Sequence, residues 1–358
     1  MDGELMPAQS GTMNPLAPSL FAPATTHLNT ASFGLLPQPA VRALQDALAA
    51  AAGGRPTDMW GDLEATRAAF ARIAGVPMHR VALGSSVTEY AAIIAASLPE
   101  GAEVLLPEAD FASLVNPFHL RRDLKIRTVP LEALADEVRD GTALVATSAV
   151  QSADGRLADL TALTAAARAH GARTLVDASQ SAGWLPVAEA DYTVAVGYKW
   201  LLCPRGITFF IAPEDQELFA SLHPLLAGWV AGEHPWDSCY GPVTEYARSA
   251  RRFDISPSLY AYVAARHGLQ VIEDLGVAAV HAHNTALADR YRAGLAERGH
   301  TPVDAPGSAI VSVPGLGARQ PELSAAGIEL SDRAGNLRAS FHLYNSAEDV
   351  DRLLALLA

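Results

Sequence analysis

The chain has 358 residues, 50% of them hydrophobic, and a formal net charge of −13. This length allows one large and one small domain, and the acidic charge without a basic run argues against nucleic acid or an anionic membrane as a partner. The two cysteines, Cys203 and Cys239, lack metal-type spacing and favour a reducing compartment. With no signal-peptide pattern and no apolar run of roughly 20 residues, we expect a soluble, cytoplasmic protein.

The N-terminal part of the chain predicts an arm followed by two helices. Residues 1–24 are rich in Pro, Ser, Gly and Thr without periodicity, which predicts a mobile arm. Amphipathic runs predict helices over 37–52 and 58–74, each followed by glycine, the residue that most often terminates a helix.

The middle of the chain alternates between strand-like and helical runs. Strands are predicted at 81–83, 103–106, 142–148, 174–176, 193–196 and 207–211, and helices at 88–98, from 111 onward and at 159–170. Such alternation predicts an α/β fold with a mostly parallel sheet between helix layers. The last two strands are separated by a segment too short for a crossover helix, so the last strand should be antiparallel.

The pattern changes after residue 213. A loop-rich stretch at 227–242, which contains Trp229 and Trp236, leads to a long helix at 259–275. The tail from about 280 predicts helix, strand, helix, two short strands and a closing helix, which suits a small C-terminal α/β domain. We therefore expect a large domain at 25–260, then a connecting helix and the small domain at 261–358.

Two charged residues each end a strand-like apolar run. Lys199 follows the run at 191–196, and Asp177 ends the run at 174–176. An unpaired buried ammonium is costly, so a lysine here usually has a chemical reason. At the carboxyl edge of a parallel sheet the two could meet, with lysine as the imine to pyridoxal phosphate (PLP) and aspartate under its ring nitrogen. The structural alternatives are an aspartate helix cap and a lysine that reaches solvent at a strand edge.

Eight motifs in order connect the chain to a known family. They are 28–34 (LNTASFG), 84–89 (GSSVTE), 148–155 (SAVQSADG), 176–180 (VDASQ), 197–200 (GYKW), 204–206 (PRG), 252–256 (RFDIS) and 337–345 (LRASFHLYN). Over about residues 27–357 the chain resembles the class V aminotransferase superfamily of fold-type I PLP enzymes, which includes cysteine desulfurases, kynureninases and isopenicillin N epimerases. The resemblance implies the fold-type I PLP-dependent transferase fold, with a mostly parallel, seven-stranded sheet in the large domain.

The resemblance also implies roles around the cofactor ring. Lys199 would form the internal aldimine, and Asp177 would keep the ring nitrogen protonated. Gln180 would hydrogen-bond near the phenolic oxygen, and Ser152 stands where relatives often carry Asn. Phe111 matches the aromatic residue or His that stacks on the ring; its structural alternative is a core phenylalanine.

The phosphate and substrate residues follow from the same resemblance. The phosphate would lie at the start of the helix formed by Ser86, Val87 and Thr88, where backbone amides and the helix dipole favour an anion. Tyr198 stands at a position that is His in desulfurases and Tyr in kynureninases, and its hydroxyl could also donate to phosphate.

Two further implications concern the partner subunit and the substrate. Ser256 matches a segment that reaches the phosphate from a neighbouring subunit, which implies a homodimer with shared active sites. Arg338 matches the arginine that holds the substrate α-carboxylate, a contact that guanidinium makes bidentately. Asn29, in the first motif, is assigned to the substrate site in the same way.

The reaction itself stays open at this point. The segment 326–338 contains no cysteine where desulfurases place their nucleophile, so persulfide chemistry is disfavoured. Aminotransferase-type chemistry on an amino acid ranks first, followed by C–S or other β-lyase and by epimerase chemistry. A non-catalytic PLP-binding regulatory protein is the alternative of another class. The pair His281 and His283 lacks further ligands, and no metal site is expected.

Overall fold

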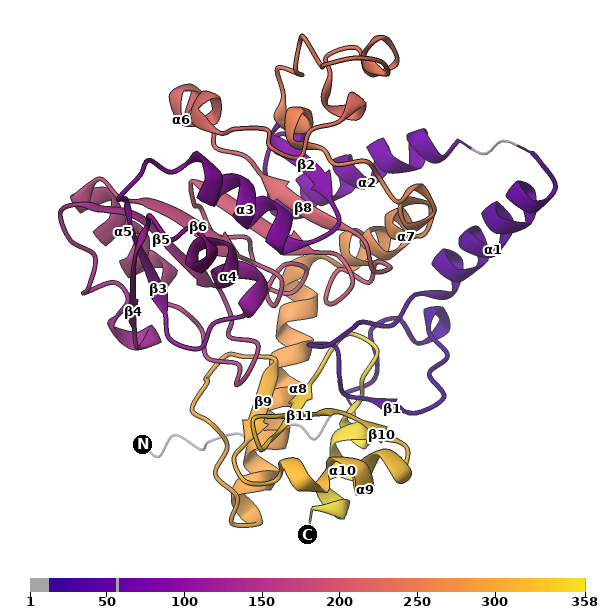
Figure 1. The fold of residues 1–358 in the computed structure, drawn as a ribbon. Helices are drawn as coiled ribbons and strands as arrows, with labels where there is room; N and C mark the ends of the chain where they lie inside the picture. Colours follow the sequence, from indigo (N-terminus) through magenta and orange to yellow (C-terminus); the bar gives the residue numbers. More distant parts are fainter. Residues whose placement is uncertain (1–12, 56–57, 358) are drawn as a thin grey trace, which may run out of the picture.

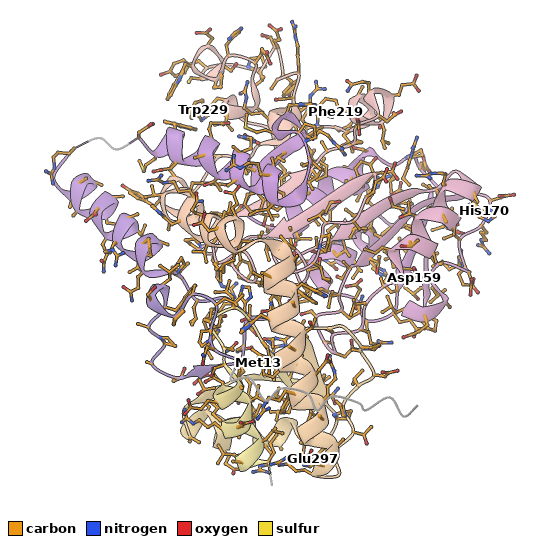
Figure 2. The ribbon with its side chains drawn as sticks, turned by 180° about the vertical axis from the view of Figure 1, so that it is seen from behind. Met13, Asp159, His170, Phe219, Trp229 and Glu297 are labelled. Carbon is orange, nitrogen blue, oxygen red and sulfur yellow. The ribbon has the colours of Figure 1, made fainter. Side chains whose placement is uncertain are left out.

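The computed structural model describes residues 13–55 and 58–357 (Figure 1). Residues 1–12 of the predicted mobile arm lie outside the described part. For residues 13–24 the prediction is corrected, because the Leu16 amide donates to the Leu343 carbonyl at 2.8 Å and Phe21 is buried against Tyr344. Figure 2 shows Met13 beside the C-terminal elements. Apolar contacts with the C-terminal part therefore hold this segment in place.

A seven-stranded sheet of order β2-β8-β7-β6-β5-β3-β4 forms the centre of the molecule. Its strands are β2 (Val81–Gly84), β3 (Glu103–Pro107), β4 (Lys125–Val129), β5 (Thr142–Ser148), β6 (Arg173–Asp177), β7 (Tyr192–Val196) and β8 (Thr208–Ile211). The predicted antiparallel strand is confirmed, since β8 pairs antiparallel with both β2 and β7 while the other pairs are parallel. Strand β4 was not predicted; as a largely polar edge strand it carries little apolar signal.

Helices cover both faces of this sheet. They are α2 (Met59–Ala74), α3 (Val87–Ser97), α4 (Ala112–Leu120), α5 (Leu160–His170), α6 (Gln216–Ser221) and α7 (Leu259–Leu275), whereas α1 (Gln38–Ala52) packs against α7. Alternate residues of a strand face opposite layers. Helices α3 and α4 accordingly pack on Leu175 and Val194, whereas α2 and α7 pack on Ala195 and Phe209 from the other side. Asp58 and Asp159 cap the first turns of α2 and α5, as their positions before apolar runs predict.

The C-terminal part is built on a smaller sheet of order β11-β12-β9, in which all strands pair antiparallel. Its elements are α8 (Val277–Glu297), β9 (Ile310–Val313), α9 (Gln320–Ala325), β10 (Ile328–Glu329), β11 (Ser331–Arg333), β12 (Asn336–Ser340) and α10 (Ala347–Leu356). Three short strands follow α9, one more than predicted. Helix α8 runs from the central sheet into this part (Figure 1) and ends at Glu297, at the opposite end of the molecule from Trp229 (Figure 2).

Contacts cross the predicted domain boundaries in both directions. Helix α7, assigned to the second domain, contributes Tyr262 and Leu269 to the core beneath the large sheet. Strand β1 (Thr26–His27), assigned to the first, pairs in parallel with β10. Within residues 13–55 and 58–357, no helix combines the length and apolar character needed to cross a membrane.

Short 3-10 turns complete the structure. They lie at Pro18–Leu20, Met78–Arg80, Leu131–Ala133, Trp229–Ala231, Pro235–Ser238, Ala250–Phe253 and Gly317–Arg319.

Candidate active site

The two strand-end residues meet at one edge of the large sheet. Asp177 is the last residue of β6, and Lys199 lies three residues beyond the end of the neighbouring parallel strand β7. Both side chains line a cavity of about 170 Å³. Eight of the predicted site residues line it: Ser86, Val87, Phe111, Ser152, Asp177, Gln180, Tyr198 and Lys199.

Lys199 is a buried amine with an unusual protonation equilibrium. Its pKa is lowered to about 8 because burial disfavours the ammonium; Asp177 acts in the opposite direction, and Arg338, Arg205 and Arg333 lower the pKa further. Its Nζ lies 5.3 Å from the centre of the Phe111 ring. Among the described residues no carboxylate lies within 4 Å of Nζ. A free amine that loses its proton near neutral pH is suited to nucleophilic attack on an aldehyde.

Asp177 is a buried carboxylate without a cationic partner within 4 Å among the described residues. Burial raises its pKa, while the Ser179 amide, which donates to Oδ1 at 2.8 Å, and Lys199 act in the opposite direction. A buried carboxylate is stable when a positive group neutralises it. A protonated pyridine nitrogen supplies such a charge, so the residues present fit the PLP ring.

Phe111 presents an aromatic face to the cavity. Its side chain is 45% exposed, unusual for a residue of this size, and it immediately precedes α4. The adjacent Asp110 is buried and accepts hydrogen bonds from the Ser148 amide at 2.7 Å and the Ser148 hydroxyl at 2.6 Å. This anchor to the end of β5 holds the backbone at Phe111 in place. Because Phe111 is exposed to the cavity, it is not a core phenylalanine.

Gln180 is oriented by its neighbours. Its Oε1 accepts from the Trp200 indole at 2.8 Å, and its Nε2 donates to the Ala31 carbonyl at 2.9 Å and to Ser152 Oγ at 3.0 Å. Both amide protons are therefore used within the protein. Ser152 Oγ accepts from Gln180 and from Arg338 Nη1 at 3.3 Å, which leaves its own hydroxyl proton available.

The start of α3 differs in part from the prediction. Ser86 and Val87 line the cavity, but Thr88 is exposed and lies outside it, because neighbouring residues of a helix face different directions. The Glu89 carboxylate caps this helix, accepting from the Ser85 and Ser86 amides at 2.8 and 2.9 Å. Ser85, which the sequence reasoning missed, also lines the cavity.

Three other predicted residues lie outside the cavity of this single chain. Ser256 is exposed, on the segment before α7. Asn29 accepts from Ser331 Oγ at 2.7 Å. Arg338 is 1% exposed and reaches the cavity wall through the carbonyl and hydroxyl of Ser152.

Arg338 is a buried guanidinium held by neutral groups. Its Nη2 donates to Ser32 Oγ at 2.8 Å, and its Nε is buried without a hydrogen-bond partner in the structure. Burial and the nearby Arg333 lower the pKa of Arg338 to about 9. An anionic ligand would neutralise the buried positive charge of Arg338 and could accept a hydrogen bond from its Nε.

Two arginines near the site were not predicted. Arg205 lines the cavity and stacks on Tyr198, with its guanidinium carbon 4.3 Å from the ring centre. Arg333 donates to Ser32 Oγ at 3.0 Å. Arg205 lies within a motif of the resemblance and could have been proposed from it, whereas Arg333 carried no such signal.

A glycine allows close packing behind the lysine. The Gly34 amide donates to the Tyr198 carbonyl at 2.9 Å, and a Cβ at Gly34 would lie 2.0 Å from the Lys199 carbonyl oxygen. Any side chain at residue 34 would therefore displace the backbone that carries Lys199.

The loop-rich stretch at 227–242 lies apart from this cavity. Trp229 and Trp236 pack against each other and against Trp60, with ring centres 5.1 to 5.8 Å apart, beside a separate hollow of about 300 Å³. Within one chain, these tryptophans therefore line a different hollow from the cavity that contains Lys199.

Comparisons with known proteins relate the chain to a family. The aminotransferase class V family model matches residues 36–314. A kynureninase of Deinococcus radiodurans is 30% identical over 238 residues, which is 63% of this chain and 57% of that protein. The uncharacterized aminotransferase YcbU of Bacillus subtilis is 27% identical over an alignment that covers 92% of this chain and 94% of that protein.

A solved structure shows the same fold. The cystine C–S lyase C-DES, in complex with its product cysteine persulfide, superposes with a TM-score of 0.83 at 23% identity, covering 93% of this chain and 97% of that one. With a family model that matches most of its length, the chain belongs to the class V aminotransferase family, and pyridoxal 5′-phosphate is its cofactor.

Proposed function

We propose that this protein is a PLP-dependent enzyme that acts at Cα or Cβ of an amino acid, with aminotransferase-type chemistry. One observation carries the proposal: the amine of Lys199 is buried, has a pKa lowered to about 8 and stands in the cavity whose wall Arg338 contacts through Ser152. A base thus stands in the cavity, and a guanidinium suited to bind a carboxylate lies behind the cavity wall.

The cofactor would be held by residues from several elements. Lys199 would bind it covalently, Asp177 would pair with the ring nitrogen, and Phe111 would cover a ring face. Ser86 and the amide of Val87, at the positive end of α3, would contact the phosphate. When bound, PLP supplies an electron-accepting ring that stabilises negative charge at the substrate Cα.

Separate residues of this chain would bind the substrate, transfer the proton and hydrogen-bond the cofactor. Arg338 would bind the α-carboxylate and so fix the orientation of Cα. Lys199 Nζ would take the proton from Cα, a step for which a pKa near the working pH is favourable. Since the hydroxyl of Ser152 has a free proton and the amide of Gln180 has none, we assign the hydrogen bond to the phenolic oxygen to Ser152.

The cavity favours transamination over two alternatives. A single amine that takes and returns a proton suffices for transamination, whereas two-base epimerisation needs a proton donor on each face of Cα. Desulfuration through an enzyme persulfide needs an accessible cysteine. No cysteine is among the described residues that line the cavity: Cys203 is buried, with its thiol pKa raised, and Cys239 lies on the distant 3-10 turn after Pro235.

A β-lyase is the second candidate, because the same single base can drive loss of a β-substituent. A non-catalytic regulatory protein is less well supported, since it has no need for a buried guanidinium such as Arg338 that lacks an acidic partner among the described residues.

Product analysis tests the proposal. Holoenzyme is incubated with ¹⁵N-labelled amino acids and an unlabelled α-keto acid, and we expect ¹⁵N in the amino acid formed from the keto acid. Release of pyruvate and ammonia without this transfer would replace the transaminase by a lyase. Inversion at Cα with solvent exchange, and without the other products, would indicate an epimerase. The Lys199→Ala variant is the control and should form none of these products.

We further propose a homodimer in which Ser256 reaches the partner's phosphate site. The exposure of Ser256, and its position outside its own chain's cavity, support this. Mixing Lys199→Ala with Ser256→Arg subunits should restore activity, because one of the two sites in a hybrid dimer then contains intact Lys199 and Ser256. Mixtures that stay inactive while hybrids form would contradict shared sites.

A further inference from the structure

Two guanidinium groups converge on one hydroxyl beside the active site. Arg338 Nη2 and Arg333 Nη2 donate to the same Ser32 Oγ, at 2.8 and 3.0 Å. The two Nη2 nitrogens therefore lie no farther apart than the sum of these two distances. Ser32 Oγ also lies 3.1 Å from Ser331 Oγ, so the hydroxyl that both arginines share is itself held in place.

The described residues place no carboxylate beside this pair of arginines. Within residues 13–55 and 58–357, no carboxylate lies within 4 Å of either guanidinium, although other surface arginines such as Arg319 pair with an acid. The chain as a whole carries a net charge of −13, which makes an uncompensated positive pair more unusual. Like charges at this distance are unfavourable unless an anion lies between or beside them.

The fold fixes the two arginines on one hairpin. Arg333 ends β11 and pairs with Asn336, and the turn between them uses two left-handed residues, Ala334 and Gly335. Arg338 lies on β12 opposite Ser331. Arg338 is buried and Arg333 is exposed, so the pair forms an inner and an outer positive charge. Arg338 also contacts Ser152, which lines the cavity that contains Lys199, so this hairpin lies behind the cavity wall.

We infer that the substrate carries a second acidic group and that Arg333 binds it while Arg338 holds the α-carboxylate. This inference rests on the proposed function and specifies its substrate class: amino acids with an acidic side chain. A single carboxylate would neutralise only one of the two positive charges, whereas an amino diacid supplies two negative charges, one for the inner and one for the outer arginine. Arg333 is accordingly the residue that determines specificity.

Matched acids and amides test the inference. The holoenzyme is titrated with L-aspartate against L-asparagine and L-glutamate against L-glutamine, with the absorption of the bound cofactor as readout. Calorimetry with glutarate against butyrate, which cannot react, gives a second readout that needs no turnover. We expect wild-type protein to prefer the acid of at least one pair about tenfold or more, as a charge-assisted hydrogen bond allows.

Substitution of Arg333 should remove this preference. In Arg333→Met the ratio of acid to amide affinity should fall about tenfold or more, and Arg333→Lys should keep part of it. Arg168→Met is the control: this exposed arginine near the end of α5 lies at the amino edge of the sheet, away from the site. Unfolding temperatures establish that all variants are folded.

The failures are distinguishable. Equal affinity for acids and amides in wild-type protein, or a ratio that Arg333→Met leaves unchanged, overturns the inference even if neutral amino acids react. If no amino acid of either kind changes the cofactor absorption, the proposed function fails, and the inference about its substrate fails with it.

Discussion

The indole of Trp200 donates a hydrogen bond to the side-chain oxygen of Gln180 at 2.8 Å. This contact orients the Gln180 amide, so that its oxygen faces Trp200 and its nitrogen faces Ser152 in the cavity wall. The Trp200 carbonyl lies 3.1 Å from the Nε2 of buried His342, whose pKa is lowered to about 3 by burial, so the neutral ring donates to that carbonyl at all moderate pH values. Trp200, the residue after Lys199, thus contacts both the cavity lining and the C-terminal part.

Ser152→Ala tests the donor assigned to the phenolic oxygen. A donor stabilises the ionised oxygen, so its loss should raise the pH at which the absorption of the bound cofactor titrates, by about 1 pH unit for a charge-assisted bond. Spectrophotometric titration measures this. A larger shift in Gln180→Leu than in Ser152→Ala would assign the donor to Gln180 instead.

Borohydride reduction of the holoenzyme should attach the cofactor to Lys199 alone. The chain contains only two lysines, and the other, Lys125, is an exposed residue that begins β4. Peptide mass spectrometry should therefore find the adduct on the peptide of Lys199. Lys125→Arg is the matched control and should label fully, whereas Lys199→Arg should not; label on Lys125 in folded holoenzyme would refute the central assignment.

Labelling of the cofactor-free protein should depend on pH with a midpoint near 8. Only the neutral amine attacks the aldehyde, so reactivity rises as pH increases through the lowered pKa of Lys199, about 8, instead of the value near 10.4 of a free lysine side chain. Initial rates of PLP attachment between roughly pH 6 and pH 10 measure this midpoint, because the range extends about two pH units to either side of the lowered pKa. Rates that keep rising above pH 9.5 would contradict the burial argument.

Asp177→Asn should keep much of the bound PLP but lose turnover by about a hundredfold or more, because the neutral amide cannot hold a proton on the ring nitrogen. Turnover and cofactor content are measured on the same preparation. Asp159→Asn serves as a control, since Asn caps α5 as well as Asp does. Near wild-type turnover in Asp177→Asn would remove the carboxylate from this role.

Gly34→Ala should impair cofactor binding and stability although residue 34 lies outside the cavity lining. The new Cβ would lie 2.0 Å from the Lys199 carbonyl oxygen, and the lysine backbone must move. We expect a loss of stability on the order of 2–4 kcal/mol, in the upper range for point substitutions, measured by denaturant unfolding. Gly228→Ala is the matched control, because a Cβ there meets no atom within 4 Å; equal effects of both substitutions would contradict the packing argument.

The sequence identified the parts of the molecule whose signal is local. Periodicity and caps gave helices such as α2 and α5 within a residue or two, and the apolar runs that end in Asp177 and Lys199 placed both at strand ends. Topology then brings them together without further information, because the carboxyl ends of neighbouring parallel strands share one edge of the sheet.

Features formed by distant segments had no such signal. The pairing of β1 with β10 joins residues about 300 positions apart, and it explains why residues 13–24 pack against the C-terminal part. Thr88 is an example within a single motif. The motif predicted the start of α3, but the rotation of the helix between neighbouring residues decides which side chain faces the cavity.

The fold class and the cofactor could thus be predicted from the chain alone, and Lys199 and Asp177 could be proposed as the residues that bind it, because these predictions depend on residues that are close in the chain or ordered in a motif. The electrostatics of the site arise from packing: burial lowers the pKa of Lys199, the hydrogen-bond partners of Arg338 are neutral, and a hairpin turn brings Arg333 to the Ser32 hydroxyl that Arg338 also contacts. Burial and charge proximity are properties of three-dimensional packing, and no local pattern of residues contains them.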